Sequence, residues 1–406
     1  MSGLKYWVWL SCLKGLKNQT RLALLRHFGS PEDIYYADEK DLFMVDGMEK
    51  EQVKFLKDRS MDAADKILGD CQRLNIRVMT MQDAEYPGRL RDIYDPPCLL
   101  YIKGRLPVID EEAVITVVGT RNCTPYGMMC AERISYGLTS GGAIVASGLA
   151  RGIDTAASRG ALMAGGVTLG LLGCGLDVIY PRENKNLYED IISVGALISE
   201  YPPGTSPLPG NFPARNRIMA GISVGVVVVE APPRSGALIT ASQALEQGRD
   251  IYAVPGPINA FASQGCNQLI RAGAGLVTDA REILQDYAFR FPEKFGAAKE
   301  LPTVLEEMES PGKLDGDLRQ DKSEENDQDE VLEIRDVSIS DGNLTDDQIE
   351  LLELMDIKNP IQTDDLIDQS GIPTRRVLSA LTILEIDGMI CQHIGKRYTR
   401  LINLID

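Results

Sequence analysis

The chain has 406 residues, which is enough for two or three domains, and a formal net charge of −17, which argues against a generally basic surface for nucleic acid. It contains no apolar run of ~18 residues, and its opening MSGLKYWVWLSCLKG is too short and too interrupted for a signal peptide, so we expect a cytoplasmic protein without a membrane segment. Eight cysteines without a CxxC pair and only two histidines favour reduced packing residues over a metal site or a Ser-His-Asp triad.

The first region, residues 1–70, has a helical pattern built from two similar units. Each unit places a short apolar turn with one glycine, Gly15 or Gly47, before an amphipathic helix. This pattern resembles tandem helix-hairpin-helix or SAM-like modules, whose glycine amides can hold a DNA backbone. Both turns lack the second hairpin glycine, which favours a structural or protein-contact role.

The next region, residues 71–112, leads into the core of the chain. Residues 77–80, 86–90 and 98–102 are short apolar stretches, and Tyr86-Pro87 and Pro96-Pro97 mark turns. We therefore expect a short extended lead-in.

The central region, residues 113–290, begins with VITVVGTRNCTPYG. Its β-branched run stops at Gly119 and indicates a buried parallel strand, while Thr124 and Pro125 supply an N-cap and a first-turn proline for a helix. Strand and helix patterns then alternate, with Asp154 as a further N-cap. The next strands are expected at 143–147, 167–172, 196–199, 224–230 and 251–254, and helices at 155–164, 184–193, 212–220 and 236–247. This alternation predicts an α/β fold with a doubly wound, Rossmann-like parallel sheet of five or six strands.

The last two regions differ in charge and pattern. Residues 291–343 contain a segment, 321–336, with eight acids against two bases, so we expect an acidic disordered linker. Residues 344–406 predict helices at 345–355, 363–370 and 374–387, followed by extended segments at 389–393 and 398–402, which is the order of a winged helix. Arg375 and Arg376 begin its third helix, and both duplex DNA and a protein stay open as its target.

Four turns of the central region combine glycines, small hydroxyl residues and arginines. The carboxyl ends of parallel strands meet at one edge of a sheet, so we expect these turns to form one groove. Glycine lets a phosphate approach closely, hydroxyl groups donate hydrogen bonds and arginine supplies charge. Residues 113–290 contain thirteen acidic and thirteen basic residues, and twelve of the basic residues are arginine. The central region is therefore neutral, and the negative charge of the chain lies in the flanking regions. The candidate residues are Gly119, Thr120, Arg121, Ser147, Gly148, Arg151, Arg215, Asn216, Arg217, Ser235, Gly236 and Thr240.

A further loop adds Lys185 and Tyr188, which lie three residues apart at a predicted helix start and hence on one face. A cation beside an aromatic ring suits single-stranded nucleic acid, because a base that stacks on the ring contributes roughly 1 to 3 kcal/mol. A core position for Tyr188 is the competing interpretation.

Signatures of a nucleotide-dependent enzyme are missing from the sequence. Neither GxGxxG nor the P-loop GxxxxGK[ST] occurs, and no pair of carboxylates and no Cys/His pair marks a catalytic centre. We therefore expect a protein that is not an enzyme and that uses no cofactor or metal.

Long blocks of the central region resemble, in order, those of the DNA processing protein A (DprA/Smf) family. They include GTRNCTPYG, ASGLARGIDTAASRGAL, FPARNRIMAGIS and SGALITASQALEQGRDIYAVPG. The resemblance implies an extended Rossmann domain that binds single-stranded DNA, protects incoming DNA and loads RecA recombinase during natural transformation, in a homodimer. It also implies a phosphate-gripping arginine at Arg121, a DNA-contacting lysine at Lys185 and a stacking aromatic residue at Tyr188.

Two other functions stay open at this point. Lysine decarboxylase-like nucleotide phosphoribohydrolases share this kind of Rossmann core, but an acid follows their PGGxGT turn, whereas PRSGALITASQ in this chain is followed by no carboxylate before Glu246. The other alternative is a regulator that binds duplex DNA through the winged helix.

Overall fold

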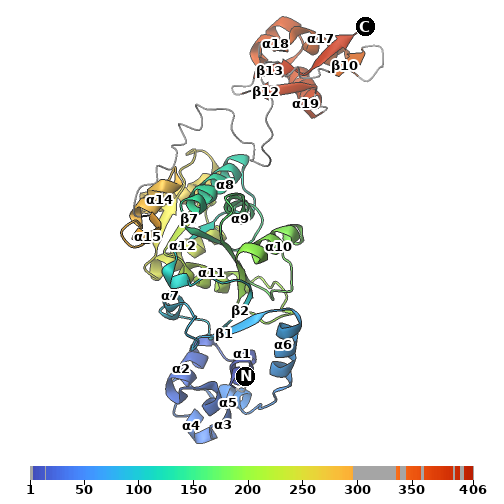
Figure 1. Ribbon diagram of the computed structural model, residues 1–406. Helices are drawn as coiled ribbons and strands as arrows, with labels where there is room; N and C mark the ends of the chain where they lie inside the picture. Colours follow the sequence, from blue (N-terminus) through green and yellow to red (C-terminus); the bar gives the residue numbers. More distant parts are fainter. Residues whose placement is uncertain are drawn as a thin grey trace, which may run out of the picture. The chain divides into compact units, whose positions relative to one another are not determined.

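The computed structural model describes residues 3–13, 15–295, 335–338, 344–357, 361–386, 389–393 and 397–405. The chain divides into two compact units, Met1–Pro311 and Gly312–Asp406, and Figure 1 labels many of their elements. Among the described residues, no helix is both long and apolar enough to cross a bilayer.

The first unit begins with a module of short helices. They are α1 (Leu4–Cys12), α2 (Asn18–Phe28), α3 (Pro31–Tyr36), α4 (Glu39–Leu42), α5 (Lys50–Leu56) and α6 (Asp62–Arg73). Gly15 and Gly47 have positive φ values of 85° and 75° and precede α2 and α5, so each glycine turn leads into a helix. A Cβ on Gly15 would lie 2.3 Å from the Phe55 ring, so the two helical units pack closely at this glycine.

A nine-stranded sheet forms the centre of this unit. Its strands are β1 (Arg77–Thr80), β2 (Leu99–Gly104), β3 (Val114–Val118), β4 (Ile144–Ser147), β5 (Thr168–Leu172), β6 (Ala196–Ser199), β7 (Gly225–Val228), β8 (Asp250–Ala253) and β9 (Gly275–Leu276). The order across the sheet is β1-β2-β6-β5-β4-β3-β7-β8-β9. Strands β3 to β9 pair in parallel, whereas β2 is antiparallel to both β1 and β6. The doubly wound α/β fold expected from the sequence is therefore confirmed, with more strands than the predicted five or six.

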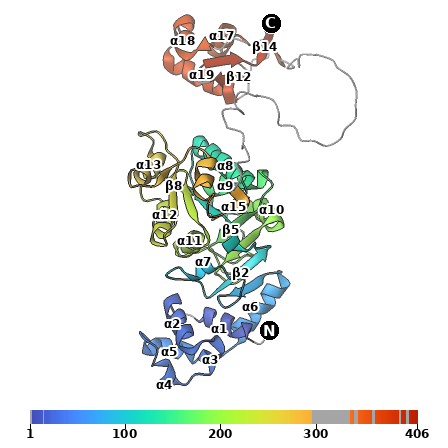
Figure 2. The same ribbon diagram turned by 60° about the vertical axis from the view of Figure 1, so that its left-hand side comes forward.

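Helices cover both faces of this sheet, as buried parallel strands require. In β7, Val226 and Val228 pack into one apolar cluster and Val227 into the opposite one. Residues of α7, α11, α12 and α13 join the first cluster, and residues of α8, α9 and α14 join the second (Figure 2). The helices are α7 (Gly88–Arg91), α8 (Pro125–Ser140), α9 (Ile153–Met163), α10 (Lys185–Val194), α11 (Asn211–Ile222), α12 (Gly236–Glu246), α13 (Gln264–Arg271), α14 (Ala280–Asp286) and α15 (Pro292–Phe295).

The structure corrects the expected lead-in and linker. Residues 86–90 are not extended, because α7 begins at Gly88, and β1 and β2 are members of the central sheet. Strand β2 pairs with β6, whose backbone groups would otherwise face solvent as an unpaired edge. The linker prediction for 291–343 is wrong at α15 and at strand β10 (Arg335–Ser338). Its residues 296–334 and 339–343 lie outside the described part of the chain.

In the second unit, the described residues form three helices and a small sheet in the expected order. The elements are α17 (Asp346–Leu354), β11 (Ile361–Gln362), α18 (Thr363–Ser370), α19 (Thr374–Ile386), β12 (Ile390–His393), β13 (Arg397–Arg400) and β14 (Ile402–Ile405). β13 pairs antiparallel with β11 and β12, while β10 and β14 form a separate parallel pair. Leu351, Val377, Leu381 and Leu384 are buried in one apolar core between the helices.

Candidate nucleic-acid interface

A groove lies where the winding direction of the sheet changes. Strand β3 has β4 on one side and β7 on the other, and the helices that follow β3 and β7, α8 and α12, cover opposite faces. The turns after these strands therefore diverge and leave a crevice at their carboxyl ends. This crevice has a volume of ≈ 560 Å³ and includes the turn at 119–121, the segment before α11 and the start of α12.

The turn at 119–121 is held from two sides. The backbone N–H of Thr120 donates to the Glu230 carbonyl oxygen at 2.7 Å, and the buried Glu230 carboxylate accepts from the N–H and hydroxyl of Thr124 at 2.9 and 2.6 Å. On the other side, Gly152 has a φ of 75°, and a Cβ there would lie 2.4 Å from the Thr120 carbonyl oxygen. These contacts fix the turn and direct the exposed Arg121 side chain into the groove lining.

Arg121 lies over an aromatic pair. Its guanidinium carbon is 5.2 Å from the centroid of the Phe212 ring, and the Phe212 ring is 5.6 Å from that of Tyr180. Within residues 3–13 and 15–295, Arg121 makes no ion pair. The groove thus combines an available guanidinium with two neighbouring, partly exposed rings inclined at 40° to each other, an arrangement that suits a phosphate next to a base.

The opposite wall is the start of α12. The Ser235 hydroxyl caps this helix by accepting from the Ala237 N–H at 3.2 Å, and Arg234 before it takes a left-handed φ of 64°. Gly236 is exposed at the first turn, where backbone N–H groups favour an anion. Thr240 lines the wall too, but it is only 1% exposed and its hydroxyl points back to the Gly236 carbonyl oxygen.

Arg215 lines the groove but is buried, and its guanidinium is engaged by other groups of the protein. Its guanidinium donates to the carbonyl oxygens of Gly148, at 2.9 Å, and Leu171. Burial lowers the pKa of Arg215 and raises the pKa of Asp154, since desolvation disfavours both charges. Asp154 does not N-cap α9 as predicted; it accepts from the N–H groups of Gly148 and Ala150 at 3.1 and 3.4 Å. This cluster stabilises the loop after β4 and offers no free cation to a phosphate.

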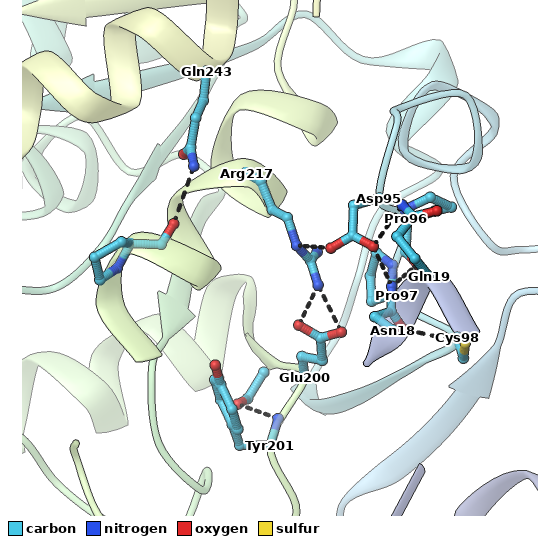
Figure 3. Close-up of polar contacts among 12 residues, drawn as sticks. Asn18, Gln19, Asp95, Pro96, Pro97, Cys98, Glu200, Tyr201, Arg217 and Gln243 are labelled. Atoms are coloured by element: carbon cyan, nitrogen blue, oxygen red, sulfur yellow. Dashed lines mark hydrogen bonds and ion pairs between the residues drawn. The ribbon is translucent and has the colours of Figure 1, made fainter. Parts of the chain in front are cut away.

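Arg217 belongs to a different contact, shown in Figure 3. Its guanidinium pairs with Asp95 at 3.0 Å and with Glu200 at 2.6 Å, and Asp95 also accepts from Asn18 and Gln19 of α2 at 2.9 and 3.0 Å. Burial disfavours the charge of Arg217, but the two carboxylates outweigh it and raise its pKa. We call these five residues the Asp95 network; it ties α11 to the helical module and does not line the groove.

The predicted partners Lys185 and Tyr188 differ in exposure. Lys185 is exposed at the start of α10, whereas Tyr188 is 2% exposed, with its ring in the core and its hydroxyl donating to the Tyr180 carbonyl oxygen at 2.9 Å. A base cannot reach the Tyr188 ring in this structure, which agrees with the competing interpretation of Tyr188 as a core residue. Tyr180, which the sequence analysis did not select, is 39% exposed and lines the groove instead.

The candidate residues thus fall into two sets. Ser147, whose hydroxyl meets that of Ser158 at 2.7 Å, and Gly148 are buried, and Arg151 is exposed in an ion pair with Glu183 outside the lining. The structure brings eight candidates together in the groove: Gly119, Thr120, Arg121, Arg215, Asn216, Ser235, Gly236 and Thr240. Phe212 and Phe261, which were not predicted, line it as well. Phe212 is the first residue of the FPARNR motif, so its place next to a predicted groove turn could have identified it as a groove residue.

Comparison with known proteins identifies the family. The model of the family "DNA recombination-mediator protein A" matches residues 77–288, and that of the "DprA winged helix domain" matches residues 340–396. The chain belongs to this family. DNA processing protein DprA of Streptococcus pneumoniae is 39% identical over 284 residues, which cover 68% of this chain and 95% of that protein. Protein Smf of Synechocystis sp. is 38% identical over 283 residues, 69% of this chain and 71% of that protein.

Structural comparison agrees with the family assignment. The X-ray structure of DprA from Streptococcus pneumoniae matches with a TM-score of 0.62 at 37% identity and covers 70% of this chain and 97% of that chain. The resemblance to DprA/Smf proteins, the α/β core and the C-terminal winged helix are therefore confirmed.

Proposed function

We propose that this DprA family member binds single-stranded DNA in the groove between the turn at 119–121 and the start of α12. The observation that carries the proposal is Arg121, which makes no ion pair within residues 3–13 and 15–295 and lies over the Phe212 ring, next to Tyr180. The guanidinium would hold a backbone phosphate, and the rings would stack with a base. Such contacts would bind single-stranded DNA of any sequence, because stacking and phosphate contacts discriminate little between the bases.

The names of the relatives support a role in DNA processing. We propose that the protein acts in the cytoplasm as a homodimer, protects incoming single strands and loads RecA recombinase onto them during natural transformation and recombination. Lys185, exposed beside the groove loop after β5, would add a further phosphate contact along the strand.

We also propose that the protein acts by binding and not as an enzyme. The two carboxylates near the turn at 119–121 are buried, and both are engaged: Glu230 by Thr124, and Asp154 by the Gly148 and Ala150 amides. Neither is placed as an exposed general acid or base.

Fluorescence anisotropy of the intact protein tests this proposal, with labelled single-stranded and duplex oligonucleotides of the same sequence across a salt series. We expect tighter binding of the single strand, weakening with salt, a loss of about 10- to 100-fold for Arg121→Glu and a smaller loss for Lys185→Glu. Arg73→Glu, on the exposed end of α6, is the matched charge-reversal control and should bind normally. A preference for duplex that survives Arg121→Glu would contradict the groove proposal and favour the winged helix as the DNA site.

A further inference from the structure

A second cavity, of ≈ 590 Å³, lies at the other end of the sheet from the groove. Because β2 runs antiparallel to β6, its last residue Gly104 pairs with Ala196, the first residue of β6. The cavity therefore sits at the amino ends of the parallel strands, and its lining includes residues of α6 and α10. It is lined by Cys71, Gln72, Asn75, Ile76, Arg77, Ile102, Lys103, Gly104, Arg105 and Ile192.

The lining is basic in a chain whose net charge is −17. It contains three cations, Arg77, Lys103 and Arg105, and no carboxylate. Arg77 pairs with the exposed Glu85. Within residues 3–13 and 15–295, the side chains of Lys103 and Arg105 make no hydrogen bond or ion pair, so both charges are available to an anion.

The backbone around these cations is fixed. Gly104 has a φ of 99°, and a Cβ there would lie 2.4 Å from the Gly195 carbonyl oxygen, so the chain crosses the start of β6 at a distance that only glycine permits. The Arg105 N–H then donates to the same carbonyl at 2.7 Å. On the facing segment, Asn75 is left-handed, with a φ of 54°, and the Ile76 N–H donates to the Cys71 carbonyl oxygen at 2.8 Å. The two basic residues are thus carried on a rigid frame.

The rest of the lining is apolar and amide-bearing. Ile192, which is half-buried, supplies aliphatic surface above the buried Ile76 and Ile102, and the exposed Gln72 and Asn75 supply side-chain amides. Burial raises the pKa of the Cys71 thiol to about 11, so this thiol is neutral near pH 7 and adds no negative charge. Aliphatic surface with amides suits a planar heterocycle, and a pocket of this volume lies in the usual range for small ligands.

We propose that this cavity binds a nucleoside di- or triphosphate, with its phosphates on Lys103 and Arg105 and its base against Ile192. The site is separate from the single-strand groove and does not depend on the function proposed for that groove. Gln72 and Asn75 would contact the polar edge of the base.

Fluorescence titration of the full-length protein with N-methylanthraniloyl-ATP tests the proposal. We expect saturable binding at one site per chain, competition by unlabelled ATP and a loss of about tenfold in affinity for Lys103→Ala and for Arg105→Ala. Arg73→Ala, outside the lining, and Arg121→Glu, in the groove, should bind the probe as the unaltered chain does.

Several outcomes would overturn the proposal. They are absence of saturable binding, unchanged affinity in the Lys103→Ala Arg105→Ala double variant, and loss of probe binding in Arg121→Glu, which would place the probe in the groove. Competition by inorganic tripolyphosphate as strong as that by ATP would show that the surface at Ile192 binds no base. Displacement of the probe from the Arg121→Glu variant by a single-stranded oligonucleotide would reassign the cavity to a nucleic-acid backbone.

Discussion

Arg121 in the groove and Arg217 in the Asp95 network come from turns of similar composition, yet they differ in exposure and in partners. Arg217 is 11% exposed and pairs with two carboxylates, whereas Arg121 is exposed and lies over an aromatic ring. A guanidinium whose donors are already satisfied has little to offer a phosphate. The comparison teaches that an arginine-rich motif marks the neighbourhood of a binding site, while burial decides which arginine binds and which one holds the fold.

Of the substitutions that test this difference, Arg217→Leu should have the largest effect on stability, because it removes the cation shared by Asp95 and Glu200. Both carboxylates are more than two-thirds buried, so their loss of a partner should lower the free energy of unfolding by about 3 kcal/mol. Arg121→Leu should change it by less than about 0.5 kcal/mol. Urea unfolding followed by the fluorescence of Trp7 and Trp9, both buried in the helical module, measures this difference. Equal effects of the two substitutions would remove the distinction between the arginines.

The precision of the groove turn can be tested at Gly152, whose Cβ position lies 2.4 and 2.7 Å from the carbonyl oxygens of Thr120 and Arg121. Gly152→Ala should cost about 1 to 3 kcal/mol in stability and weaken single-strand binding, because the turn must move. Gly165→Ala is the control: its φ of 71° is similar, but nothing lies within 4 Å of its Cβ. Oligonucleotide anisotropy should therefore separate the two variants, and equal affinities would show that the turn position does not matter.

Stacking in the groove is tested by a pair of tyrosines. Tyr180→Ala should weaken binding of a single-stranded oligonucleotide by about 1 to 3 kcal/mol, the usual contribution of one stacked base, with a smaller effect on duplex. Tyr188→Phe keeps the buried ring and loses only the hydroxyl group with its two hydrogen bonds to the Tyr180 backbone, so its affinity should change little. The reverse order of effects would restore Tyr188 as the stacking residue.

The sequence predicted where the turns of the groove lie, because strand and helix periodicity together with the Thr124 cap locate the strand ends. It did not predict which face of α10 is buried. Leu187, Tyr188 and Ile191 form the inward stripe of that helix, and the selection of Tyr188 treated an apolar position as a binding position. The spacing of these three residues is that of a buried helix face, so the burial of Tyr188 could have been predicted from the sequence alone.

Other features depended on contacts distant in sequence. The burial of Arg215 requires the Gly148 backbone, 67 residues away, and that of Arg217 requires Asp95, so no local pattern reveals either. The pairing of β2 with β6 is equally non-local, and for that reason the lead-in was expected as a separate extended segment.

A further difference between the two regions lies on the alkaline side of the stability curve, because their thiols differ in burial. Burial raises the pKa of Cys98, which donates to Asn18 of the Asp95 network, from 9.0 to about 12. A raised pKa means that the folded chain holds this proton more tightly, so the stabilisation is complete below pH 9 and is lost as the pH rises toward 12.

Cys98→Ala should therefore make the loss of stability between pH 9 and 11 shallower by at most about 1.4 kcal/mol per pH unit. Buried tyrosines such as Tyr101 contribute to the same alkaline loss, so a slope remains in the variant. Cys123→Ala, at the half-buried thiol that follows the groove turn, should change the slope less, since its desolvation is smaller. Urea unfolding at a series of alkaline pH values gives both slopes. A slope identical to that of the unaltered chain in Cys98→Ala would mean that this thiol reaches solvent in the folded state, and hence that the contact between the helical module and the sheet opens where the structure shows it closed.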